Sequence, residues 1–189
     1  MKYDYLLKKC DLCRRHCGVN RLNGELGICA ADDKLIVARA ELHLWEEPPI
    51  SCENGSGTVF FSHCNLKCVF CQNHEISQEY KGAKITINRL SDIFLELQNK
   101  GANNINLVTP THYVPQIIEA IEIAKSKGLK LPILYNTNGY DTLETIKLLD
   151  GYIDVYLPDF KYFDDKYSIK YSKAKDYSSE IIPILKEMV

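Results

Sequence analysis

Apolar runs and amphipathic segments alternate along the later part of the chain. Four runs rich in β-branched and aromatic residues predict buried strands at residues 58–62, 105–108, 133–135 and 153–157. Apolar positions with helical spacing predict four helices at residues 89–100, 115–127, 143–149 and 179–188. Strands that alternate with helices favour right-handed βαβ units around a parallel sheet. The pattern therefore predicts an α/β fold with about four βα units.

The residues before this alternation have a different character. Residues 34–45 look extended, and the prolines at 48 and 49 end any regular element there. Glycines at 55 and 57 form a flexible turn that leads into the first core strand. We therefore expect two parts, a Cys-rich metal-binding segment at 1–54 and a core at 55–189.

Unusual polar residues follow each of the four predicted strands. In parallel sheets the ligand site lies beyond the carboxyl ends of the strands, so these residues are expected to meet at one rim. They are Cys64, Cys68 and Cys71, then Thr109, Thr111 and His112, then Asn136 and Asn138, and finally Asp159 and Lys161. The convergence of four separate segments predicts one binding site.

Composition and charge exclude several classes of function. The net charge of −2 shows no basic excess, so nothing favours binding to nucleic acid or to an anionic membrane. No apolar stretch approaches the roughly 20 residues that span a bilayer, and the first residues show no signal-peptide pattern. Eight cysteines in such a chain are metal ligands or redox groups more often than disulfides. We therefore expect a cytoplasmic protein.

Cys64, Cys68 and Cys71 have the spacing C-x3-C-x2-C, on the loop that leaves the first core strand. Three thiolates are soft ligands that suit an iron–sulfur cluster or zinc. Three ligands leave one corner of a four-iron cluster open for a substrate or cofactor, as in catalytic zinc sites. The alternatives are a zinc site completed by His63 or His74, and three unconnected core cysteines.

A second group of cysteines lies at positions 10, 13, 17 and 29. Glycines and asparagines between them tolerate the tight turns that wrap a metal. A segment this short cannot build its own core, so it predicts a knuckle that needs its metal to fold. Zinc and a second iron–sulfur cluster are both allowed, and free thiols in a loop are the remaining alternative. Cys52 belongs to neither group and is expected to be a plain loop or buried thiol.

The C-x3-C-x2-C spacing, with Phe70 before its last cysteine, resembles the radical SAM superfamily. The likeness extends to the pyruvate formate-lyase activating enzyme-like group, in a branch whose substrate we cannot name. The stretches that carry it are Cys10-Asp11-Leu12-Cys13, Glu46-Glu47-Pro48-Pro49, Gly57-Thr58-Val59-Phe60-Phe61, Cys71-Gln72-Asn73, Val108-Thr109-Pro110-Thr111-His112-Tyr113, Tyr135-Asn136-Thr137-Asn138-Gly139 and Leu157-Pro158-Asp159-Phe160-Lys161.

The resemblance implies a partial (β/α) barrel and a [4Fe-4S] cluster held by the three cysteines. S-adenosylmethionine would chelate the fourth iron and be cleaved reductively to a 5′-deoxyadenosyl radical. The electron would come from a reduced flavodoxin- or ferredoxin-type protein. The radical would act on a glycyl-radical enzyme or on another protein or small-molecule substrate. The rival functions are a non-catalytic zinc-binding module and an electron-transfer protein with two clusters.

The resemblance also implies cofactor-binding roles at the rim. The segment after the second strand contacts the amino group of S-adenosylmethionine, often through Gly-Gly-Glu, whereas this chain has Thr109-Pro110-Thr111. A hydroxyl or a backbone carbonyl can still accept a hydrogen bond from that group. Phe70 and Asn73 are expected to shape the pocket around the adenine or the cluster.

The later strands contribute amide and charged side chains to the same expected site. Asn136 and Asn138 can bond ribose hydroxyls or a carboxylate, or can serve the turn before Gly139. Lys161 can neutralise the cofactor carboxylate with Asp159 orienting it, or the two can form a surface pair. His112 is expected to be either a proton donor or a helix-start residue.

The resemblance implies six core strands, of which the pattern supplies four. The last two usually carry the contacts to adenine and ribose. We therefore expect the 189 residues to be the N-terminal part of a longer protein, lacking roughly two βα units of about 30 residues or more each.

Overall fold

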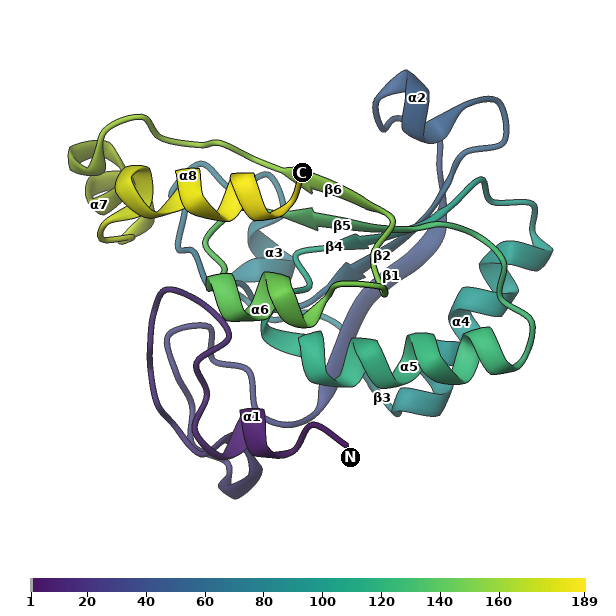
Figure 1. The fold of residues 1–189 in the computed structure, drawn as a ribbon, viewed down its shortest axis with the longest axis horizontal. Helices are drawn as coiled ribbons and strands as arrows, with labels where there is room; N and C mark the ends of the chain where they lie inside the picture. Colours follow the sequence, from purple (N-terminus) through teal and green to yellow (C-terminus); the bar gives the residue numbers. More distant parts are fainter. Residues whose placement is uncertain (1) are drawn as a thin grey trace.

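The structure, a computed structural model, describes residues 2–189 and contains one six-stranded mixed sheet (Figure 1). Its spatial order is β3-β1-β2-β4-β5-β6. The strands are β1 (Leu35–His43), β2 (Ser56–Phe61), β3 (Ala83–Ile85), β4 (Ile105–Val108), β5 (Ile133–Thr137) and β6 (Val155–Pro158). Strands β2, β4, β5 and β6 pair in parallel, whereas β1 pairs antiparallel with both β2 and β3. The predicted α/β class and the parallel core are confirmed.

Three details of the sheet differ from the sequence prediction. Strand β1 pairs with β2 from Val37 opposite Phe61 to His43 opposite Ser56, so the boundary expected near residue 55 falls between paired strands. The short strand β3 was not predicted. Strand β6 begins two residues later than predicted, because Asp154 lies in the preceding turn and its Oδ2 accepts the Ile133 N–H at 2.8 Å.

Residues 2–189 also form eight α-helices, of which α2 to α6 connect strands. They are α1 (Tyr5–Lys8), α2 (Pro48–Ser51), α3 (His74–Ser77), α4 (Ile87–Asn99), α5 (Val114–Ser126), α6 (Leu143–Leu148), α7 (Asp165–Ser172) and α8 (Tyr177–Glu187). Two 3-10 turns, η1 (Arg21–Asn23) and η2 (Thr111–Tyr113), complete the regular elements of these residues. No helix of residues 2–189 has both the length and the apolar character needed to cross a membrane.

Helices α4 and α5 lie side by side along one face of the sheet (Figure 1). Between them and the strands, fully buried side chains such as Val59, Leu107, Phe94 and Ile117 form the main core. Burying an aliphatic or aromatic side chain of this size stabilises the fold by roughly 1.5–3 kcal/mol. This core fixes the strands, and therefore the loops at their carboxyl ends.

A second apolar cluster lies beneath the cysteine loop. It joins Leu66 and Cys68 of that loop to tyrosines at positions 140, 162 and 177. These tyrosines come from the loop after β5, the loop after β6 and the start of α8. Packing of three separate segments holds the cysteine loop against the end of the sheet.

The N-terminal segment docks on the loop after β5 and the start of α6. Cys13 forms an isolated antiparallel bridge with Asp141, and the Thr145 hydroxyl donates to the Leu12 carbonyl at 2.9 Å. Arg21 is fully buried and donates from Nη1 to the His112 carbonyl at 2.6 Å. Polar contacts to the core therefore position this segment.

Candidate functional site

A cavity of about 490 Å³ opens at the carboxyl ends of the parallel strands. Such a volume is typical of small-molecule and cofactor sites. Among the residues predicted from sequence, its lining includes Cys64, Cys68, Phe70, Cys71, Asn73, Thr109, Asn136, Asn138, Asp159 and Lys161. The predicted convergence of four strand ends at one rim is confirmed. The lining also includes His43 and Glu46, to which the sequence reasoning gave no role in the site.

Thr111 and His112 lie away from this cavity. Thr111 is 1% exposed, and its Oγ1 lies 3.4 Å from the Tyr135 hydroxyl. His112 is equally buried and its Nε2–H donates to the Ser62 carbonyl at 2.8 Å. Burial lowers the pKa of His112 to about 3, so its ring is neutral at physiological pH. Both side chains face the protein interior.

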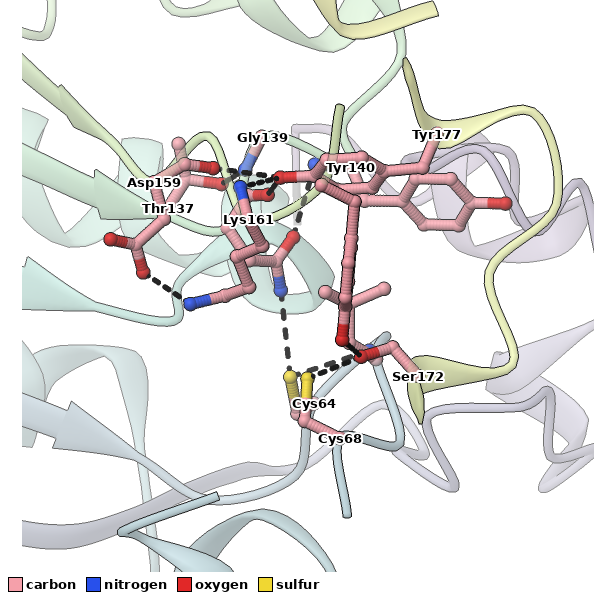
Figure 2. A network of polar contacts seen from close by, with 12 residues as sticks. Cys64, Cys68, Thr137, Gly139, Tyr140, Asp159, Lys161, Ser172 and Tyr177 are labelled. Carbon is pink, nitrogen blue, oxygen red and sulfur yellow. Dashed lines mark hydrogen bonds and ion pairs between the residues drawn. The ribbon is translucent and has the colours of Figure 1, made fainter. Parts of the chain in front are cut away.

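Each sulfur of the cysteine loop lies close to a polar hydrogen-bond partner. Cys64 Sγ accepts from the Leu66 N–H at 3.4 Å and from Asn138 Nδ2 at 3.5 Å. Cys68 Sγ accepts from the Ser172 hydroxyl at 2.8 Å, and Cys71 Sγ lies 3.3 Å from the Ser77 hydroxyl. Figure 2 shows the contacts that reach Cys64 and Cys68. Donors of this kind favour the charged thiolate that metals require.

Burial opposes that charge when no cation is nearby. It raises the pKa of Cys64 to about 12, and the neighbouring Cys68 and Cys71 sulfurs raise it further. A bound metal supplies the compensating positive charge and deprotonates its thiol ligands. The loop therefore has three sulfurs with polar partners, as a metal-binding site requires.

The two histidines near the cysteine loop have partners of their own. Within residues 2–189, no three His, Cys, Asp or Glu side chains are grouped so that they could hold one metal ion. His63, a candidate fourth zinc ligand, stacks on Tyr80 at 4.4 Å, and its Nδ1 lies 3.1 Å from the Cys29 carbonyl. His74 is exposed and lies 3.4 Å from Glu79.

Asn138 joins the loop after β5 to the cysteine loop. Its Nδ2 donates to Asn65 Oδ1 at 2.7 Å, beside the contact to Cys64, and its Oδ1 accepts the Tyr140 N–H at 3.0 Å. The second bond is the side-chain-to-backbone bond of a turn, which is one of the two roles that the sequence predicts for this residue. Asn138 therefore serves the turn and also holds the Cys64 sulfur in place. Asn136, two residues earlier, lines the same cavity.

Asp159 and Lys161 form an ion pair at the cavity, with 2.5 Å between Oδ2 and Nζ. The Tyr177 hydroxyl fixes the backbone around them, because it lies 2.7 Å from the Asp159 carbonyl and accepts the Lys161 N–H at 3.0 Å. The same hydroxyl lies 2.8 Å from the Asn138 carbonyl. Tyr177 thus ties the ends of β5 and β6 together.

Ser172 and Tyr162 are site residues that the sequence reasoning missed. Ser172 is the last residue of α7, fully buried, with its hydroxyl on Cys68. The Tyr162 hydroxyl lies 2.5 Å from Ser172 Oγ and completes a hydrogen-bond chain onto the sulfur. No local motif marks either residue, because the contact depends on how α7 folds back over the loop.

A profile of the Radical SAM superfamily matches residues 58–188 of this chain. The chain belongs to the radical SAM superfamily. Membership implies a [4Fe-4S] cluster and S-adenosylmethionine, which agrees with the three thiols that line a cofactor-sized cavity. An uncharacterised protein of Methanocaldococcus jannaschii is 33% identical over 180 residues, which cover 91% of this chain and 51% of the relative. The chain thus spans about half the length of that curated relative. Assignment to the pyruvate formate-lyase activating enzyme-like group stays a prediction.

Proposed function

We propose that this chain is the cluster-binding part of a radical SAM enzyme, with Cys64, Cys68 and Cys71 as ligands and S-adenosylmethionine in the adjoining cavity. The chemistry supplied by these bound groups is one-electron reductive cleavage to methionine and a 5′-deoxyadenosyl radical. One observation carries the proposal. Three hydrogen-bonded thiols on a single loop, one buried and two half-buried, line a cavity of about 490 Å³ built from the ends of the parallel strands.

The polar groups of the cavity suit the charged end of S-adenosylmethionine. Lys161 carries a positive charge that can pair with the methionine carboxylate, and Asp159 restrains its ammonium group. Asn136 lines the same wall and offers both a donor and an acceptor. These assignments follow from placement in the cavity together with side-chain chemistry.

Thr109 supports the expectation that the loop after β4 meets the ligand. Its φ of 57° is unusual for a β-branched residue, and such a conformation costs roughly 1–3 kcal/mol. Strained residues of this kind concentrate at ligand sites. Thr109 lines the cavity, so its hydroxyl or carbonyl is our candidate acceptor for the ligand's amino group.

The apolar lining suits the rest of the ligand. Phe60, Phe61 and Ile76 border the cavity and supply surface for an adenine ring. Phe70 also lines it but is 56% exposed, so it lies toward the entrance. Apolar walls also limit the access of water to a reactive radical.

The finer proposal is that the radical is delivered to a glycyl-radical enzyme, with the electron taken from a flavodoxin- or ferredoxin-type donor. It rests on the resemblance of the sequence motifs to the pyruvate formate-lyase activating enzyme-like group. A different protein or a small molecule as substrate is the alternative. Mixing the reduced protein and S-adenosylmethionine with deuterium-labelled candidate substrates, and following the transfer of deuterium into 5′-deoxyadenosine, would separate these cases.

The core proposal is tested with the chain reconstituted anaerobically with iron and sulfide and then reduced. On adding S-adenosylmethionine we expect methionine and 5′-deoxyadenosine in equal amounts, measured by chromatography. The variant with Cys64→Ala, Cys68→Ala and Cys71→Ala should give neither product. Cys52→Ala, which removes an exposed cysteine outside both groups, should behave as the parent. The proposal would be refuted if the chain, with its cluster reconstituted, yields neither product and its spectrum does not change when S-adenosylmethionine is added.

A further inference from the structure

The four N-terminal cysteines meet around a second, smaller cavity that is lined by a different set of residues from the first. Cys10, Cys13 and Cys17 come from one loop, and the chain then turns through η1 to bring Cys29 back to them. Gly27 makes this return possible, because a Cβ at that position would lie 2.8 Å from Cys17 Sγ. The fold thus gathers four thiols that are up to nineteen residues apart (29 − 10) in the sequence.

All four sulfurs have hydrogen-bond donors nearby. The Ile28 N–H donates to Cys17 Sγ at 3.5 Å, and Arg21 Nη1 lies 3.9 Å from Cys10 Sγ. Backbone N–H groups two residues on reach the other two, from Arg15 to Cys13 and from Ala31 to Cys29. The thiol sulfur is a weak acceptor, whereas a thiolate is a good one. Four donors on four sulfurs therefore describe a pocket for four thiolates, whose charges require a cation between them.

The size of the enclosed space distinguishes a cluster from a zinc ion. The space is about 10 Å³, so a water-sized sphere of about 1.4 Å radius fits between the lining atoms. In a tetrahedral zinc site the Zn–S bonds are about 2.3 Å, which leaves no such room at the centre.

We propose that Cys10, Cys13, Cys17 and Cys29 hold a second iron–sulfur cluster. Their four thiolates fill all of its ligand positions. Because no corner is open, this cluster does not bind S-adenosylmethionine. It sits beside the first site, since Arg15 Nε donates to the Asn65 carbonyl at 2.7 Å and Nη2 donates to the Ser172 carbonyl at 3.1 Å. Arg15 thus connects the N-terminal knuckle to the two segments that hold Cys64 and Cys68.

The test counts metal in the 189-residue chain after anaerobic reconstitution. In the variant with Cys64→Ala, Cys68→Ala and Cys71→Ala, we expect about two to four irons per chain, matched by sulfide, with no zinc. Adding S-adenosylmethionine should leave the spectrum of that variant unchanged. Removing Cys13 and Cys17 as well should abolish the remaining iron, whereas adding Cys52→Ala instead should not.

The parent chain provides a second measurement that does not depend on a folded variant. Mössbauer spectroscopy should show two iron populations, only one of which changes when S-adenosylmethionine is added. One zinc per chain with a single iron population would overturn the second cluster, and so would iron at the Cys64 site alone. Loss of the S-adenosylmethionine response with both iron populations present would instead count against the proposed function and leave this inference standing.

Discussion

Ser172→Ala is expected to lower the reduction potential of the cluster that we propose at Cys64, Cys68 and Cys71. The Ser172 hydroxyl donates to Cys68 Sγ at 2.8 Å, and the Tyr162 hydroxyl supports it from the other side. A hydrogen bond to a ligand sulfur stabilises the reduced cluster, which carries more negative charge, more than it stabilises the oxidised one. Removing the bond therefore makes reduction harder.

The size of the shift follows from the strength of one such bond. A hydrogen bond to a charged group is worth about 1.5–3 kcal/mol. If roughly half of the lower value depends on the added electron, the change is about 0.75 kcal/mol. A one-electron couple moves by about 59 mV for each 1.4 kcal/mol, so we expect a shift of about −30 mV. Tyr162→Phe should give a smaller shift, because Ser172 can still donate to the sulfur.

The assay is an anaerobic redox titration followed by electron paramagnetic resonance, read on the signal that responds to S-adenosylmethionine. Ser168→Ala is the matched control: this serine lies one turn earlier in α7 and is also fully buried, but it donates to the Ala174 carbonyl at 2.7 Å. It should lose stability without moving the potential. An unchanged potential in Ser172→Ala, or an equal shift in both variants, would refute the reasoning.

Three further variants test other contacts. Arg15→Lys cannot keep the separate bonds to the Asn65, Ser172 and Lys173 carbonyls. Denaturant unfolding should therefore show a free energy of unfolding that is lower by about 1–3 kcal/mol. An unchanged midpoint would contradict the anchoring role of Arg15. Gly27→Ala places a Cβ against the Cys17 sulfur. The variant should lose the iron of the N-terminal site and keep the iron of the Cys64 site. Equal iron in the variant and in the parent chain would argue against that close approach. Burial lowers the pKa of His112 from 6.5 to about 3. As the pH falls below 6.5, the unfolded chain therefore binds the proton before the folded chain does. The free energy of unfolding should then fall, by about 2 kcal/mol at pH 5. His112→Gln should flatten this dependence in metal-free unfolding curves, and parallel curves for the two proteins would show that His112 is not responsible.

The sequence predicted the parallel core and the position of the site because both depend on local patterns. Buried strands such as 105–108 are short apolar runs, and a parallel sheet brings its strand ends to one edge. The three cysteines follow the first of these strands directly. Their closeness to Asn138 and Lys161 then follows from the order of the strands.

The missed features depend on tertiary contacts. Helix α7 contains serines, lysines and tyrosines with little apolar periodicity, so nothing local indicated that Ser172 would reach Cys68. Thr111 shares its short stretch with Thr109, but the chain turns there into the 3-10 helix η2, and Thr111 points into the interior. The partners that decide these orientations lie more than twenty residues away, as with Tyr135 and Thr111.

The central claim is that the cluster at Cys64, Cys68 and Cys71 offers one open iron to S-adenosylmethionine. Hyperfine spectroscopy of the reduced protein with S-adenosylmethionine labelled at its amino nitrogen and carboxylate oxygen tests this directly. We predict that both labelled atoms couple to the cluster in the parent chain, and that the coupling is absent in the variant lacking the three cysteines. A reduced cluster that shows no coupling to either atom at saturating S-adenosylmethionine would contradict the account.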